Sequence, residues 1–151
     1  MSLKVRIEVD ENLTEDEVII RCRDINKEVV NIKQSITDVI NEKKTLVCTR
    51  EKTEYFIAID GILFVETDGD KIMVHTIDNI YYVKMKLYEM EQLLPGFFCR
   101  CSKSAIVNLN MIYSIERNIS STSIISFKNS DKKVYVSRRY YGLLKERKKS
   151  Y

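Results

Sequence analysis

The sequence has little of what metal sites and nucleotide sites are built from. Its 151 residues include one histidine and four glycines. The scattered glycines form neither a GxGxxG nor a GxxxxGK[ST] phosphate loop. A four-ligand zinc site would have few side chains to draw on with a single histidine. We therefore expect neither a metal nor a cofactor.

Long apolar segments are missing as well. The most apolar stretch, residues 55–65, is interrupted by Asp60 and is too short to cross a bilayer. The opening MSLKVRIEVDENL lacks the apolar core of a signal peptide. One proline and four glycines leave little room for long flexible linkers. We expect a cytoplasmic protein with one compact domain, or a small domain with a short appendage.

Signals for catalysis are weak. The four cysteines are expected to be reduced thiols, and Cys99 and Cys101 would share one face of a strand, a poor geometry for bonding to each other. A small enzyme using either thiol would need a setting that stabilises the thiolate, which the sequence does not reveal. His75 lies in a predicted strand, where a lone histidine is more often a packing or surface residue than a general base. We predict that the chain is not an enzyme.

The charge is unevenly distributed. Residues 1–46 hold eight Lys and Arg against ten Asp and Glu, whereas residues 47–151 hold seventeen against twelve. The last fourteen residues contain six basic side chains and one acidic one. A basic end suits contact with a polyanion. A solvated helix face would explain the same charges.

The first 43 residues predict a strand–strand–helix unit. Residues 4–9 alternate apolar and polar side chains, which is typical of a half-buried strand, and residues 18–22 (VIIRC) form a second apolar run. Apolar residues between 25 and 39 recur at steps of four and three and predict a helix, with Asp24 or Asn26 able to cap its start. Such a unit has a very small core, so we expect it to dock on the rest of the chain or on a second copy.

Beyond Lys43 the pattern changes to short strands separated by tight turns, such as those at Asp60-Gly61 and Asp78-Asn79. Two helices interrupt them: one over residues 87–94, stopped by Pro95, and one after residue 139. The fold class is therefore α+β, with a β-β-α unit over residues 1–43 and a mainly antiparallel β-domain over residues 44–151. The predicted strands cover residues 45–50, 54–59, 62–67, 71–76, 80–85, 98–101, 112–117, 123–128 and 133–137.

Residues 94–115, LPGFFCRCSKSAIVNLNMIYSI, carry the most specific motif. Residues 60–66 (DGILFVE) and 134–139 (VYVSRR) flank it in order. Together the three blocks resemble LytTR DNA-binding domains over roughly residues 45–147. The residues that match the family's central segment are Leu94, Pro95, Phe97, Arg100, Ser104, Val107, Asn108 and Ile112.

The resemblance implies a β-fold that reads double-stranded DNA from loops and one helix start. Members of the family insert side chains from separate loops into successive major grooves. By this resemblance Lys71, Lys103 and Arg139 fall at base-contact positions, where Lys and Arg can donate to guanine O6 and N7. The candidates for phosphate contacts are Arg100, Ser102, Ser104, Arg138 and Lys145.

Some of these residues have structural alternatives. Arg100 could pair with a carboxylate such as Glu66. Asn108 could tie off a turn through backbone hydrogen bonds. Ser137 could cap the terminal helix.

The sequence therefore favours a transcription regulator that binds promoter repeats as a homodimer. It has no room for a phosphorylatable receiver domain, and the N-terminal unit is expected to dimerise or to bind a membrane protein or another regulatory partner. The rival is a protein-interaction module of the same fold that has lost DNA binding. Ser102, where the family often has His, and the acidic turn at Asp68 and Asp70 favour the rival, whereas Lys103, Arg138 and Arg139 oppose it.

Overall fold

The computed structural model describes residues 3–40, 44–118 and 122–151. The chain divides by its internal contacts into two units, Met1–Glu42 and Lys43–Tyr151. The boundary expected between residues 43 and 44 adjoins residues 41–43, which lie outside the described part, so it stays a prediction. The two units are described separately.

In its described residues, 3–40, the first unit forms one helix, α1 (Lys27–Ile40). Asn26 caps it, since its Oδ1 accepts a 3.0 Å hydrogen bond from the backbone N–H of Val29. The predicted helix and its cap are confirmed. The apolar stripe of α1 is partly buried at Val29 and Ile32, while Val39 remains exposed.

The two strands expected at residues 4–9 and 18–22 are wrong, because both segments lie outside any helix or strand. Val5, Ile7 and Val9 are 96%, 91% and 88% exposed. Alternation shows which side chains a strand could bury, but a strand also needs a hydrogen-bonding neighbour and a surface to cover. The described part of this unit supplies neither.

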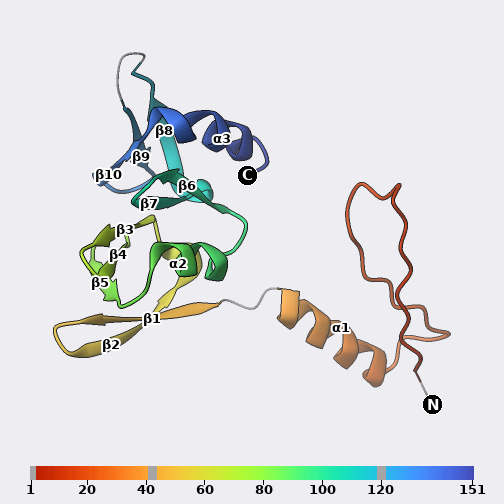
Figure 1. Cartoon of the computed structure of the whole chain (residues 1–151). Helices are drawn as coiled ribbons and strands as arrows, with labels where there is room; N and C mark the ends of the chain where they lie inside the picture. Colours follow the sequence, from red (N-terminus) through yellow and green to blue (C-terminus); the bar gives the residue numbers. More distant parts are fainter. Residues whose placement is uncertain (1–2, 41–43, 119–121) are drawn as a thin grey trace. The chain divides into compact units, whose positions relative to one another are not determined.

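The second unit is built on a seven-stranded antiparallel sheet in the order β2-β1-β5-β4-β3-β7-β6 (Figure 1). Neighbouring strands in the chain are mostly neighbours in the sheet, as expected where tight turns join them. The strands are β1 (Thr45–Arg50), β2 (Thr53–Ala58), β3 (Phe64–Asp68), β4 (Lys71–His75), β5 (Ile80–Val83), β6 (Phe98–Ser102) and β7 (Ala105–Asn108).

A second sheet of three antiparallel strands, in the order β10-β9-β8, completes the unit. Its strands are β8 (Ile112–Glu116), β9 (Ser123–Phe127) and β10 (Lys133–Val136). The helices are α2 (Leu87–Leu93) and α3 (Arg138–Lys148), with single 3-10 turns η1 (Ile59–Gly61) and η2 (Leu109–Met111). The predicted α+β class is confirmed, and all nine strands expected beyond residue 44 are present, β1 with the predicted bounds and the others with shifted ends. Strand β7 was not predicted.

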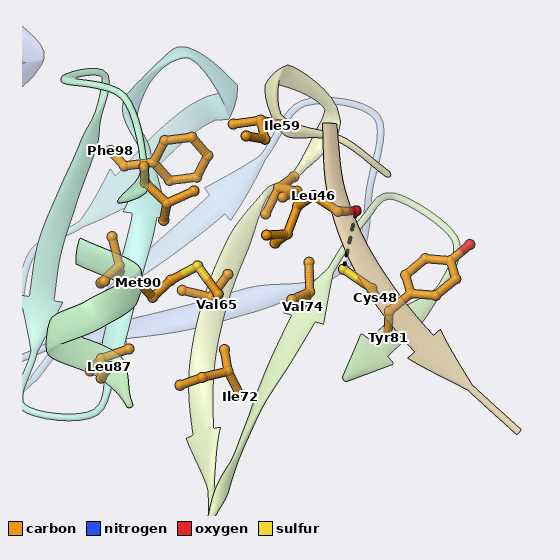
Figure 2. Close-up of a cluster of buried hydrophobic side chains, with 13 residues drawn as sticks. Leu46, Cys48, Ile59, Val65, Ile72, Val74, Tyr81, Leu87, Met90 and Phe98 are labelled. Carbon is orange, nitrogen blue, oxygen red and sulfur yellow. Dashed lines mark hydrogen bonds between the residues drawn. The ribbon is translucent and has the colours of Figure 1, made fainter. Parts of the chain in front are cut away.

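Two groups of buried side chains hold this unit together. One lies between α2 and one face of the large sheet, where Leu87 and Met90 lie beside Val65 and Ile72 (Figure 2). The other joins the second sheet and α3 to strands β3, β6 and β7, and includes Phe64, Phe127 and Leu144. Strands β3, β6 and β7 thus contribute to both cores, which fixes the two sheets relative to each other.

Two buried polar side chains reinforce the joint. Asn108 is fully buried, donates to the carbonyl of Ile62 at 2.8 Å and accepts from the N–H of Asn110 at 3.0 Å. The predicted turn-tying role of Asn108 is confirmed. His75 stacks on Phe64 with 4.1 Å between ring centroids, and its Nε2 lies 2.9 Å from Glu66 Oε1. His75 is therefore a packing residue.

Candidate nucleic-acid interface

The first predicted contact residue, Lys71, opens β4 at the tip of the β3–β4 hairpin. Asp68 pairs with Lys71, which leaves Gly69 and Asp70 as a two-residue turn. Gly69 has a φ of +61° at the first central position, as type II′ hairpin turns require. The Lys71 side chain is exposed and its Nζ lies 5.4 Å from the centre of the Tyr82 ring.

The second, Lys103, lies in the β6–β7 turn beside that hairpin. Glu66 of β3 pairs with Ala105 of β7, and the N–H of Thr67 donates to the carbonyl of Ser104 at 2.9 Å. Since Thr67 precedes Asp68, the β3–β4 and β6–β7 turns leave the same end of the sheet. The Lys103 side chain is exposed there.

The two serines of the β6–β7 turn bond within it. The Oγ of Ser102 accepts a 3.2 Å hydrogen bond from the N–H of Ser104, and the two hydroxyls lie 3.3 Å apart. Both serines therefore shape the turn, whatever else they contact. Ser104 is exposed and Ser102 is half-buried.

The Arg100 side chain bonds to backbone carbonyls of the β6–β7 turn. Its Nε donates to the carbonyl of Ser102 at 3.0 Å, and its Nη2 donates to the carbonyl of Lys103 at 2.8 Å. Its Nη1 forms an ion pair of 2.6 Å with Glu91 of α2. The carboxylate that meets Arg100 is thus Glu91, not Glu66, whose partner is His75. A guanidinium can donate to two carbonyls and a carboxylate at once, because its N–H groups point in fixed, different directions, which an ammonium group does not offer.

The third, Arg139, lies in the first turn of α3. The N–H of Ser137 donates to the carbonyl of Cys101 at 2.9 Å, which ties the start of α3 to the end of β6. Arg138 and Arg139 are the first two residues of the helix and are both exposed. Positive charge at a helix N-terminus opposes the helix dipole, so helix stability does not explain these two arginines.

Ser137 occupies the N-cap position, but its side chain makes no cap hydrogen bond. The predicted capping by its hydroxyl is wrong. Its Oγ is buried without a hydrogen-bond partner among the described residues. The backbone carbonyl of Ser137 does accept from the N–H groups of Tyr140 and Tyr141, both at 3.1 Å.

The three predicted base-contact residues therefore extend from one connected group of turns. Two hydrogen bonds link these turns: Thr67 of β3 donates to Ser104, and Ser137 donates to Cys101 of β6, the strand that leads into the turn containing Ser104. Lys71, Lys103 and Arg139 are exposed, and among the described residues none of them forms an ion pair. Lys145 is also exposed and stands seven residues after Arg138, on the same face of α3. Such an arrangement offers several free cations to one anionic surface.

The three buried thiols, Cys48, Cys99 and Cys101, are unsuited to nucleophilic chemistry. Burial raises the pKa of Cys101 to about 12 and that of Cys48 to about 11. Burial also raises the pKa of Cys99, against the opposing effect of the Arg147 guanidinium. Protonated thiols are poor nucleophiles and poor metal ligands. In the described part of the chain, no three His, Cys, Asp or Glu side chains gather as they would around a metal ion.

None of the helices that the structure describes is long and apolar enough to span a membrane.

Comparison with known proteins agrees with this geometry. Residues 52–149 match the LytTr DNA-binding domain family. The fold is similar to that of a solved LytTr DNA-binding domain from Bacillus cereus, with a TM-score of 0.64 and 27% identity, over 70% of this chain and 96% of the other.

Similar full-length proteins occur in Staphylococcus aureus. An uncharacterised HTH-type transcriptional regulator of strain bovine RF122 / ET3-1 is 29% identical over 96% of this chain and 97% of its own length. A regulator of the same description in strain MRSA252 is 28% identical over the same shares. The family match covers well over half of the chain, so this protein belongs to the LytTr DNA-binding domain family.

Proposed function

We propose that the chain is a sequence-specific transcription regulator that binds promoter repeats through the turns of its β-domain. The observation that carries the proposal is the linked group of turns that presents Lys71, Lys103 and Arg139 free of ion pairs. Duplex DNA attracts such cations through its phosphates, and long Lys and Arg side chains reach base edges in the major groove. The transcriptional-regulator description of the Staphylococcus aureus proteins supports it. The chain would act in the compartment that holds the DNA, the cytoplasm.

Within this proposal, Lys71, Lys103 and Arg139 contact bases in successive major grooves. Arg138, Lys145 and the hydroxyls of Ser102 and Ser104 contact phosphates. Arg100 was also expected to contact phosphate. The bonds that its guanidinium already makes favour a positioning role, in which it shapes the β6–β7 turn for Lys103.

The N-terminal unit, residues 1–43, is proposed to join two copies of the chain. Its apolar side chains at positions 5, 7 and 9 are almost fully exposed in the single chain, and the stripe of α1 is only partly covered. A second copy would give the exposed alternating segment a strand partner, and a dimer would match two repeats on the DNA. Deletion of residues 1–43 should yield a monomer in sedimentation experiments, and an unchanged oligomer would refute this role.

The rival function is a protein-interaction module that keeps the fold without binding DNA. The negative charges of Asp68, which precedes the β3–β4 turn, and of Asp70, which lies in it, favour this rival. Selection from a random-sequence DNA library separates the two. The DNA-binding hypothesis predicts enrichment of duplexes that contain two copies of a short motif. It also predicts that affinity falls steeply as the salt concentration rises. If no sequence is enriched over several rounds of selection, the result supports a protein-interaction module that does not bind DNA.

A further inference from the structure

The molecule has a second cationic feature beside the proposed interface. A hollow of about 450 Å³ opens next to Lys71, and Arg50 and Lys84 line it together with Lys71 and the ring of Tyr82. Glu51 and Asp70 also line it, so its charge is mixed with an excess of cations. The family match begins at residue 52, so Arg50 lies ahead of the matched segment.

The position of the hollow follows from the strand order. In the sheet β2-β1-β5-β4-β3-β7-β6, the Lys103 turn lies two to three strands from β4 on one side, while β5 and β1 lie on the other. Ile72 pairs with Val83, so Lys71 and Lys84 are the next residues across the β4–β5 pair. Arg50 ends β1, one strand further. Because Thr49 pairs with Tyr82, Arg50 is level with Tyr81 and not with Lys84. The hollow therefore lies past Lys71 on the side away from Lys103, with its cations offset along the strands.

Two features of the hollow act against folding. Like charges opposite each other across paired strands destabilise a sheet, and Lys84, the residue after β5, follows the Ile72–Val83 pair opposite Lys71. In the described residues neither side chain has a carboxylate partner within ion-pair distance. The β1–β2 turn is formed by Glu51 and Lys52 with φ values of 49° and 66°, a left-handed conformation that favours glycine. Local costs of this kind persist where a site has work other than folding.

We propose that this hollow binds backbone phosphates of the DNA next to the segment that Lys71, Lys103 and Arg139 contact. Lys84 and Arg50 donate to phosphate oxygens beyond the Lys71 contact, and Thr49 and Tyr82 also line the hollow. Strands lie about 4.8 Å apart, so the two steps from β4 to β1 add roughly 10 Å. That length corresponds to about three base pairs of B-DNA. This inference rests on the proposed DNA-binding function and lengthens its footprint.

Arg50 differs from Lys84 in having one partner. Its Nη1 donates to Oδ1 of Asn79 at 2.6 Å, which leaves the other guanidinium N–H groups for a phosphate. Lys84 is therefore the cleaner residue to change, and Arg50 serves as the second variant.

The experiment uses the full chain and a duplex that the protein itself selects from a random-sequence library. The duplex is shortened one base pair at a time from each end, and affinity is measured for the wild type, Lys84→Ala, Arg50→Ala and Lys133→Ala. Lys133 serves as the matched control, because it is an exposed lysine. It is the first residue of β10, and Ser137 follows the last one. Thermal unfolding of each variant verifies the fold.

For the wild type we expect affinity to fall about threefold when the flank of about three base pairs is removed from one end of a half-site. Arg50→Ala, which keeps the Lys84 contact, should bind the long duplex more weakly than the wild type and lose less affinity on shortening. Lys84→Ala should show the same pattern, because only the Arg50 contact with the flank remains. Its salt slope should fall by about 1. Lys133→Ala should behave as the wild type.

The inference is overturned if Lys84→Ala keeps the flank sensitivity of the wild type, or if shortening leaves wild-type affinity unchanged. Arg139→Ala separates this failure from that of the proposed function. If Arg139→Ala weakens binding while Lys84→Ala has no flank effect, only the flank contact is wrong. If Arg139→Ala also binds as the wild type, the proposed interface is wrong and the flank contact falls with it.

Discussion

The backbone N–H of Ser137 donates a 2.9 Å hydrogen bond to the carbonyl oxygen of Cys101. This single bond places the first turn of α3 against the end of β6, from which the β6–β7 turn departs. Arg139 and Lys103, which are 36 positions apart in the sequence, therefore extend from adjoining segments. The proposed DNA-binding surface depends on that junction and on the matching bond between Thr67 and Ser104.

Arg138 allows a test of phosphate contact. The change Arg138→Ala should weaken binding to every duplex by a similar factor and should lower the slope of log affinity against log salt by about 1. Its removal should not destabilise α3, because it relieves an unfavourable charge at the helix start. Titrations at several salt concentrations measure the slope, and a slope equal to that of the wild type would remove Arg138 from the interface.

Arg100 and Glu91 provide a test of positioning against direct contact. If Arg100 shapes the β6–β7 turn, Glu91→Gln should loosen the turn and lower DNA affinity by a few-fold, about the value of a partly exposed ion pair. If Arg100 instead contacts phosphate, Glu91→Gln would free its charge and raise the affinity. Affinity measured on the same duplex decides between the two signs.

A conservative change at Arg100 gives an independent readout. Lysine cannot donate to both turn carbonyls and to Glu91, so Arg100→Lys should lower the free energy of unfolding by about 1–2 kcal/mol. Chemical denaturation measures this loss. An Arg100→Lys variant with wild-type stability would mean that the bonds to Ser102 and Lys103 contribute little.

His75 predicts a pH dependence of stability. Burial lowers the pKa of His75 below its usual 6.5, despite the opposing effect of Glu66. Near that pH the unfolded chain takes up a proton that the folded chain does not, so the free energy of unfolding falls as the pH drops below about 6.5. The loss stops once the pH passes below the lowered folded-state pKa.

The control for this behaviour is His75→Gln, which keeps a polar side chain without the titration. Denaturation curves between pH 5 and pH 7.5 should show a smaller drop for the variant than for the wild type, with carboxylates contributing equally to both. Equal drops would mean that His75 has the same pKa in the folded and unfolded chains.

The cysteines predict a simple pattern of thiol reactivity. Cys22 is exposed, whereas Cys48, Cys99 and Cys101 are buried, and burial raises the pKa of all three buried thiols. A thiol reagent at pH 8 should therefore label Cys22 rapidly and the other three only on unfolding. Rapid labelling of Cys99 or Cys101 in the native protein would reopen a redox or nucleophilic role.

The sequence predicted the elements where side-chain periodicity and local chemistry agree. Helix α1 has its stripe and its Asn26 cap in one segment, and the short strands are separated by turns with strong local preferences. Strand β7 was missed because all four of its residues, Ala105–Asn108, are buried, so no alternation marks it. The strand prediction for residues 4–9 failed for the opposite reason. Apolar and polar side chains alternate there, but among the residues that the structure describes no neighbouring strand pairs with the segment.

Partners distant in the sequence were the hardest part of the site to predict. The carboxylate that meets Arg100 comes from α2, whose packing on the sheet the sequence does not specify, and so Glu66 was the wrong candidate. The bond from Ser137 to Cys101 is made by backbone atoms, which leave no mark in residue identity. By contrast, the lysines and arginines proposed to contact DNA were selected by their positions in the family motif, which does not require knowing the packing of distant elements.

The most direct test of the proposed interface is a base-pair substitution scan of the selected duplex with the wild type, Lys103→Ala and Arg139→Ala. We expect Arg139→Ala to lose about 1–3 kcal/mol of binding free energy and to stop discriminating at one base pair. Lys103→Ala should stop discriminating at a different base pair. If both variants keep the full base preferences of the wild type, the turns at this end of the sheet do not read DNA.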